Sequence, residues 1–343
     1  MMKRSLGHIL ASVAALLSSA LPMRAQTDIR TYTLPEGNYK VTVTLGDRKK
    51  ATETSVWAET RRLMASGVRT ARGESRTISF TVNRRDPSIL REGASRVDYV
   101  RYNPERGRLD WDGWFTLAFE GTPGAVQDIK IEPTDNVITV FLCGDSTVTN
   151  QDDAPWTSWG QIFPLFFDDR VSIANYAESG ASLSSFIAEN RFEKILSVLK
   201  PGDYVFIEFG HNDEKEKGPG QGAWYHYSQQ IKFMIDKVRA QGGIPLLLTP
   251  VERRFFNDDG TLAPSHGDFP AAVRAIAARE SVPLIDLTAI TGRWIQDAGP
   301  EDSKKAFVEG DNTHSNFYGA DLTARMVIQA LISANHPLAA YMR

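Results

Sequence analysis

The chain has 343 residues, of which 42% are hydrophobic and 24% charged, and its formal net charge is −3 at pH 7. This composition is typical of a soluble globular protein with a sizeable core, and it excludes a disordered or fibrous chain. The length predicts two domains or one large domain, and the nearly balanced charge predicts no nucleic-acid partner.

The first 25 residues have the pattern of a secretory signal peptide. Lys3 and Arg4 precede a largely apolar stretch, residues 6–21, and Ala25 gives a small residue at the predicted cleavage site. A membrane anchor is the alternative, but the most apolar part is too short to span a bilayer well. We therefore expect cleavage after Ala25 and a secreted or periplasmic protein with no membrane span.

Residues 26–135 alternate apolar and polar side chains in short stretches separated by Gly and Pro. The alternation covers residues 39–45, 78–82, 115–119 and 129–131. Period-two patterns with regular turn signals predict an all-β sandwich, and no stretch here has the length and period of a helix. We therefore expect an accessory β-sandwich domain that ends near residue 135.

After that boundary, strands and helices alternate through a second domain, residues 136–343. Such alternation predicts a parallel sheet with helices on both faces, an α/β fold. The predicted strands cover residues 137–142, 171–176, 203–209, 244–249 and 282–287, and the predicted helices cover residues 182–199, 225–241, 269–281 and 317–334.

The first of these strands leads directly into Gly144, Asp145 and Ser146. Glycine lets the backbone turn sharply there, and open α/β sheets hold ligands at the carboxyl ends of their strands. On its own the tripeptide is more typical of a turn. Other polar groups follow the next strands or precede the last helix, at residues 178–182, 210–213 and 311–314.

Ser146, Asp311 and His314 follow the order nucleophile, acid, base, and the acid precedes the base by three positions. That spacing lets one turn present the carboxylate to the imidazole, whose other nitrogen can take the serine proton. The oxyanion that forms needs preorganised donors. The Ser146 N–H, expected at a helix start, the Gly180 N–H and the Asn212 amide can supply them.

These separated pieces resemble the block pattern of the GDSL, or SGNH, hydrolase superfamily: Gly-Asp-Ser, a Gly, Gly-x-Asn-Asp and Asp-x-x-His. The nucleophile elbow of the α/β-hydrolases is absent, because Val148 stands where its second glycine would be. The stretches at 144–148, 156–161, 209–213 and 249–254 look like the rhamnogalacturonan acetylesterase branch, and the resemblance covers residues 137 to about 334. The N-terminal part resembles the galactose-binding-like module that precedes some members.

The resemblance implies a three-layer, flavodoxin-like parallel sheet and a serine esterase that needs no metal or organic cofactor. It implies that Ser146 is the nucleophile, His314 the general base and then acid, and Asp311 its orienting partner. Ser146, Gly180 and Asn212 would form the oxyanion hole. The implied partner is an acetylated acidic polysaccharide or oligosaccharide, from which a pectic acetylesterase removes acetyl groups.

Other residues compete for roles at the site. His211 and His266 are the remaining plausible bases, and His211, beside Asn212, is also a candidate substrate contact. Arg253 and Arg254 follow a strand and could pair with galacturonate carboxylates, with surface salt bridges as the alternative. Trp156 is a further candidate substrate contact. The single cysteine, Cys143, is interpreted as a small buried hydrophobe.

One region is unusually basic: residues 61–108 contain 12 Arg, no Lys and 5 acidic residues. We expect it to help hold an acidic polysaccharide, with ordinary solvated strand faces as the alternative. Two other functions stay open. The enzyme could act on another acylated glycan or a small acyl ester, or the chain could be a non-catalytic glycan-binding protein. The oligomeric state is not predicted.

Overall fold

The computed structural model describes residues 27–90, 93 and 96–343, so the predicted signal peptide lies outside the described residues. Within the described part, no helix is long and apolar enough to cross a membrane. The strands are β1 (Asp28–Tyr32), β2 (Gly37–Gly46), β3 (Thr52–Ala58), β4 (Arg62–Thr70), β5 (Ser75–Arg84), β6 (Ser88–Ile89), β7 (Asp98–Tyr99), β8 (Phe115–Gly121), β9 (Val126–Pro133), β10 (Ile138–Cys143), β11 (Val171–Asn175), β12 (Tyr204–Glu208), β13 (Ile244–Leu248) and β14 (Leu284–Ile285). The α-helices are α2 (Arg108–Trp111), α3 (Trp159–Ile162), α4 (Leu183–Ala188), α5 (Arg191–Val198), α6 (Ser228–Ala240), α7 (Phe269–Glu280), α8 (Leu287–Asp302) and α9 (Phe317–Ser333).

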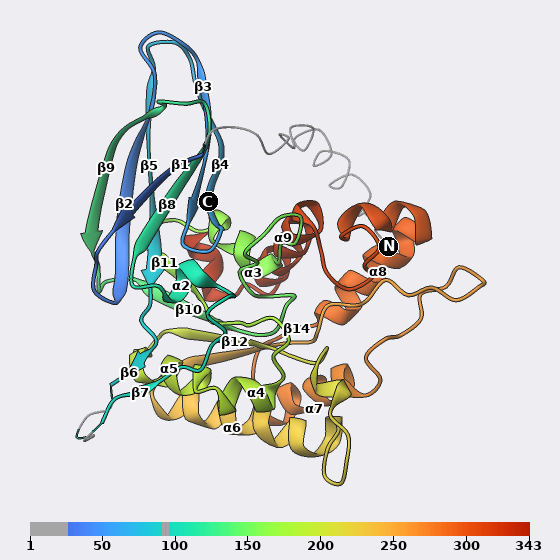
Figure 1. Cartoon of the computed structure of the whole chain (residues 1–343). Coiled ribbons are helices and arrows are strands. Elements are labelled where there is room, and N and C mark those ends of the chain that lie inside the picture. Colours follow the sequence, from blue (N-terminus) through green and yellow to red (C-terminus); the bar gives the residue numbers. More distant parts are fainter. Residues whose placement is uncertain (1–26, 91–92, 94–95) are drawn as a thin grey trace.

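Five parallel strands form the α/β part of the molecule, in the spatial order β14-β13-β12-β10-β11. Numbered along the chain, this is the flavodoxin order 2-1-3-4-5. The strands are buried apolar runs, as two-sided parallel strands require. One core cluster joins them to α4, α5, α6 and α7, and another joins them to α3 and α9, so the predicted three-layer α/β fold is confirmed (Figure 1).

The N-terminal region extends that same sheet. Strand β5 pairs in parallel with β11, at Thr81 with Ser172 and Val82 with Ile173, and β2 and β9 follow in antiparallel order. A four-stranded sheet, β1-β8-β3-β4, packs against this end, with a separate apolar cluster between the two sheets. The β-rich region is present as predicted. The domain boundary near residue 135 stays a prediction, and one continuous sheet has strands on both sides of it.

Several local expectations were wrong. The single helix predicted over residues 182–199 is two helices, because Asn190 adopts a left-handed conformation with φ 62° between α4 and α5. The strand predicted over residues 282–287 is only β14, and the helix α8 that follows it was not predicted. Asp286 starts α8 by accepting a hydrogen bond from the Ala289 N–H.

Candidate active site

The turn after β10 presents Ser146 at the carboxyl edge of the sheet. It is a tight turn and does not start a helix as expected: the N–H groups of Val148 and Thr149 both donate to the Asp145 carbonyl. A side chain at Gly144 could not fit, because its Cβ would lie 2.5 Å from a methyl carbon of Val148. The Gly-Asp-Ser sequence is therefore what allows so sharp an exit from the strand.

Ser146, His314 and Asp311 form a continuous chain of hydrogen bonds. Ser146 Oγ lies 2.9 Å from His314 Nε2, and His314 Nδ1 lies 2.7 Å from Asp311 Oδ2. Asp311 Oδ1 also accepts the backbone N–H groups of Thr313 and His314. Burial pushes the pKa of Asp311 upward, but these donors and the His314 ring outweigh it and hold that pKa below its usual range. The carboxylate therefore stays ionised and orients the ring.

The predicted oxyanion donors also lie around this serine. Within the described residues, the N–H groups of Ser146 and Gly180 have no hydrogen-bond acceptor in the protein. Gly180 has φ 84°, a conformation that favours glycine. Asn212 uses one amide proton on the Ala181 carbonyl, at 2.9 Å, and keeps the other. Three donors are thus available to an incoming oxygen.

All these groups open onto one cleft of about 620 Å³. Its lining includes Ser146, Gly180, Asn212 and His314, while Asp311 lies behind His314. A nucleophile paired with an oriented base, beside free N–H donors in an accessible cleft, is the arrangement that acyl transfer requires.

Comparison with known proteins decides the family. The model of the GDSL-like Lipase/Acylhydrolase family matches residues 142–322. Rhamnogalacturonan acetylesterase RhgT of Bacillus subtilis is 37% identical over 216 residues, which are 59% of this chain and 92% of RhgT. The chain belongs to the GDSL-like lipase/acylhydrolase family. It is an esterase, as predicted.

A second relative covers more of the chain. The uncharacterized esterase YxiM of Bacillus subtilis is 29% identical over 306 residues, 87% of this chain and 72% of YxiM. A crystal structure of YxiM superimposes with a TM-score of 0.57 at 27% identity, covering 90% of this chain and 81% of that one. The likeness to YxiM is too long to be confined to residues 136–343, so it includes the β-rich N-terminal region.

The competing histidines of this GDSL-like esterase lie beside the triad, with their rings 4.5 Å apart. His211 lines the cleft and is buried, and neither of its ring nitrogens has a partner within the described residues. Burial, reinforced by nearby cations, lowers its pKa well below the usual value. His266 is held at both nitrogens, by Glu214 Oε2 at 3.1 Å and the Val251 carbonyl at 2.8 Å. Neither ring contacts Ser146, so the geometry favours His314 as the base.

The two arginines differ in position. Arg253 lines the cleft, but its guanidinium forms an ion pair with Glu214 and donates to the His211 carbonyl. Arg254 is absent from the cleft lining and donates to Asn312 Oδ1 at 2.6 Å, on the loop that carries the acid and the base. These contacts favour a loop-positioning role for Arg254 over a substrate contact. Trp156 is exposed at the cleft, as a substrate contact requires.

A pair of buried carboxyl groups, Asp145 and Glu208, lies behind the serine; the sequence predicted that Asp145 braces the turn, but it gave no role to Glu208. Asp145 accepts both the N–H and the hydroxyl of Thr147, and Glu208 accepts the Trp159 indole N–H at 2.8 Å. Burial raises the pKa of both groups, and with the added repulsion of Asp145 that of Glu208 reaches about 8. These groups brace the strand ends behind the site. The signal that could have revealed Glu208 is a carboxyl group at the end of a strand, beside the Gly-Asp-Ser turn.

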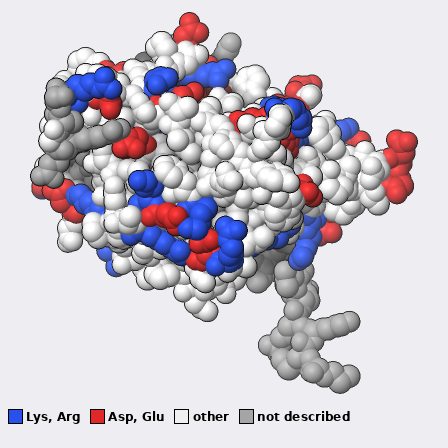
Figure 2. All heavy atoms as spheres, turned by 90° about the horizontal axis from the view of Figure 1, so that it is seen from below, with Lys and Arg blue, Asp and Glu red and all other residues white. Residues whose placement is uncertain are grey.

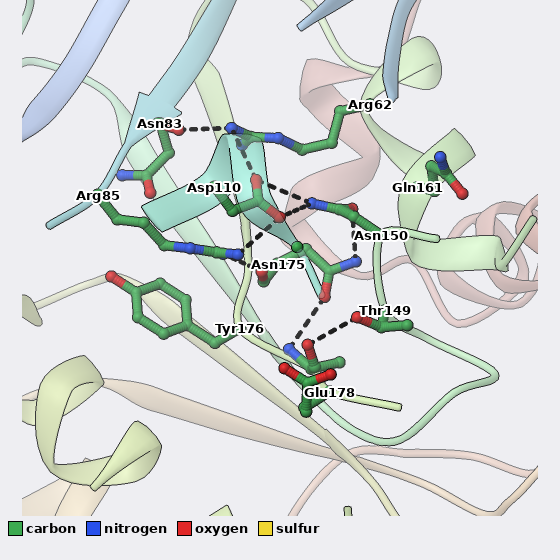
Figure 3. Close-up of polar contacts among 12 residues, drawn as sticks. Arg62, Asn83, Arg85, Asp110, Thr149, Asn150, Gln161, Asn175, Tyr176 and Glu178 are labelled. Atoms are coloured by element: carbon green, nitrogen blue, oxygen red, sulfur yellow. Dashed lines mark hydrogen bonds and ion pairs between the residues drawn. The ribbon is translucent and has the colours of Figure 1, made fainter. Parts of the chain in front are cut away.

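Within the described residues, the Arg-rich region is divided between surface and interior. The exposed arginines are Arg69, Arg72, Arg76, Arg96, Arg101 and Arg106, whereas Arg62, Arg84 and Arg85 are buried. Arg62 and Arg85 are buried around Asp110, with Arg85 Nη2 2.9 Å from Asp110 Oδ2 (Figure 3). Asp110 also accepts from Asn150 Nδ2 at 2.9 Å, and Asn150 bonds in turn to Asn175. Buried arginines need such partners. The network ties the N-terminal region to the segment that follows Ser146.

Proposed function

We propose that this esterase is a secreted carbohydrate acetylesterase that removes acetyl groups from acetylated pectic polysaccharide of the rhamnogalacturonan type. The observation that carries the proposal is the chain from Ser146 through His314 to Asp311, with unpaired N–H donors beside the serine. The substrate class is supported by the relatives: RhgT and a 26% identical protein of Emericella nidulans are named rhamnogalacturonan acetylesterases.

The proposed reaction has two steps. His314 Nε2 takes the Ser146 hydroxyl proton as Oγ adds to the acetyl carbonyl, and the negative oxygen is held by the N–H groups of Ser146 and Gly180 and the Asn212 amide. The tetrahedral intermediate then expels the sugar oxygen, which receives that proton from His314. Water, activated by the same ring, attacks the acetyl-serine, and acetate leaves with Ser146 restored.

Acetate release from acetylated rhamnogalacturonan tests the mechanism. Ser146→Ala and His314→Ala should each lower kcat by about 10⁴-fold or more, and Asp311→Ala by less, because the ring then loses its orientation but not its proton acceptor. Ser197→Ala, on the exposed side of α5, is the matched control and should retain full activity. Release by Ser146→Ala at the wild-type rate would refute the serine mechanism.

A substrate panel separates the alternatives kept open by the sequence. We expect the highest kcat/KM on acetylated rhamnogalacturonan, compared with acetylated xylan and 4-nitrophenyl acetate. A preference for xylan would contradict the pectic assignment, and the absence of turnover on all three would favour a glycan-binding protein. Secretion predicts that the extracellular protein begins at Gln26, which N-terminal sequencing measures.

A further inference from the structure

The N-terminal region builds part of the wall of the active-site cleft. Residues 105–107, together with Asp110 and Trp111, line the same cleft as Ser146 and His314. These residues belong to the connection between β7 and β8, in the half of the molecule that carries no triad residue. Whatever occupies the cleft beside the serine therefore meets side chains from both halves of the chain.

Arg106 is a cation of that wall, and it lies beside the oxyanion donor Gly180. Its Nη1 donates to the Ser179 carbonyl at 3.0 Å, and it would lie 4.0 Å from a Cβ placed on Gly180. The residue is exposed, and within the described residues its guanidinium forms no ion pair, although its charge acts on the more distant carboxylate of Glu178. Because a guanidinium has five N–H donors, this one retains donors for a ligand.

Lys215 is a second such cation, and it lies beside Asn212. Its ammonium donates to Asn212 Oδ1 at 2.8 Å, and the side chain is exposed. No carboxylate among the described residues pairs with it. Two oxyanion donors come from outside the nucleophile turn, and each has one of these cations beside it: Arg106 lies beside Gly180, and Lys215 lies beside Asn212.

Acidic groups also line the cleft, and Glu105, Asp152 and Asp153 among them form no ion pair within the described residues. Arg85 is paired with Asp110, and Glu178 is paired with Arg191 at 2.5 Å. Asp152 accepts the Gly107 N–H at 2.8 Å. Figure 2 shows basic and acidic side chains intermixed over the face seen from below, so that face has no extended basic surface. Arg106 and Lys215 are the arginine and the lysine of the cleft lining that form no ion pair within the described residues, and each contacts a segment that carries an oxyanion donor.

We propose that Arg106 and Lys215 form a subsite for the carboxylate of an acidic sugar that carries or adjoins the acetyl group. The inference rests on the proposed function and adds a specificity determinant supplied by the N-terminal region. A planar guanidinium binds a carboxylate with two parallel hydrogen bonds, and an ammonium adds a point charge. Because the subsite adjoins the oxyanion donors, it places the acidic sugar directly against the ester.

The test compares one acetylated rhamnogalacturonan oligosaccharide with free carboxyl groups against the same oligosaccharide with its carboxyl groups methyl-esterified. The readout is kcat/KM for acetate release, and the quantity compared is the ratio of the free acid to the methyl ester. Arg106→Gln should lower that ratio by about 10- to 100-fold, mainly through KM on the free acid. Arg106→Lys should lie between Arg106→Gln and the wild type, and Lys215→Gln should also lower the ratio.

Arg101→Gln is the matched control, because Arg101 is an exposed arginine of the same segment that does not line the cleft. It should leave the ratio unchanged. If Arg106→Gln lowers turnover of both substrates equally, or leaves the ratio unchanged, the carboxylate subsite is refuted while the proposed function stands. If the wild type deacetylates neither oligosaccharide, the proposed function itself fails.

Discussion

Asp110→Ala is the substitution that most directly tests how the two halves of the molecule are joined. Asp110 is 3% exposed, and its carboxylate is shared by Arg85, Arg62 and Asn150 (Figure 3). Alanine removes the counterion of both arginines and the hydrogen-bond acceptor of Asn150. Arg85 keeps the Asn175 carbonyl and the faces of the Trp111 and Tyr176 rings, which compensate for part of its charge.

The expected loss of stability is large. Removing one partner of a buried ion pair costs about 3–5 kcal/mol, because the remaining charge stays buried without its counterion. In a protein of this size, that loss lowers Tm by roughly 4–8 °C. The exposed Asp153, which lines the same cleft, provides the control, and Asp153→Ala should stay within about 0.5 kcal/mol of the wild type.

Chemical denaturation measures the free energy of unfolding of each variant. Adding Arg85→Gln to Asp110→Ala should recover part of the stability, because the unpaired cation is then absent, so the two changes are not additive. The reasoning is refuted if Asp110→Ala is as stable as the wild type, or if the double variant shows the sum of the two single losses.

Two further predictions concern burial and domain structure. Burial raises the pKa of Asp213 to about 7, against the opposing hydrogen bond from the Leu183 N–H, so this acid binds its proton more tightly in the folded chain. The contribution of Asp213 to the free energy of unfolding should therefore fall by about 1.4 kcal/mol for each pH unit as the pH rises from roughly 4 to 7. Asp213→Asn should remove that slope in thermal melts between pH 4 and 8, and an unchanged slope would contradict the assignment. A fragment of residues 136–343 should not fold alone, because β11 loses its partner β5 and Asn150 loses Asp110; a soluble fragment with the circular dichroism and Tm of the full chain would overturn this.

The sequence was sufficient where a local pattern determines the outcome. Helices α7 and α9 begin where their apolar periodicity begins and end within a residue of the predicted ends. Helix α8 was missed because Gly292 and Pro300 interrupt its helical pattern. The triad could be found because the order of its residue types follows from chemistry. Arg254 could not be placed, since its partner Asn312 lies 58 positions away and is brought near only by the fold.

The Arg-rich region shows what a charge count leaves out. Several of its arginines are exposed, yet Arg62 at the start of β4 and Arg84 and Arg85 at the end of β5 are buried. A charge count cannot distinguish a solvated arginine from one that is neutralised inside the protein, because the counterion comes from elsewhere in the chain. Arg106 therefore differs from the buried arginines because it lines an open cleft and forms no ion pair with a carboxylate. The proposed role of the N-terminal region in substrate choice depends on Arg106. Its role in stability depends on the buried arginines.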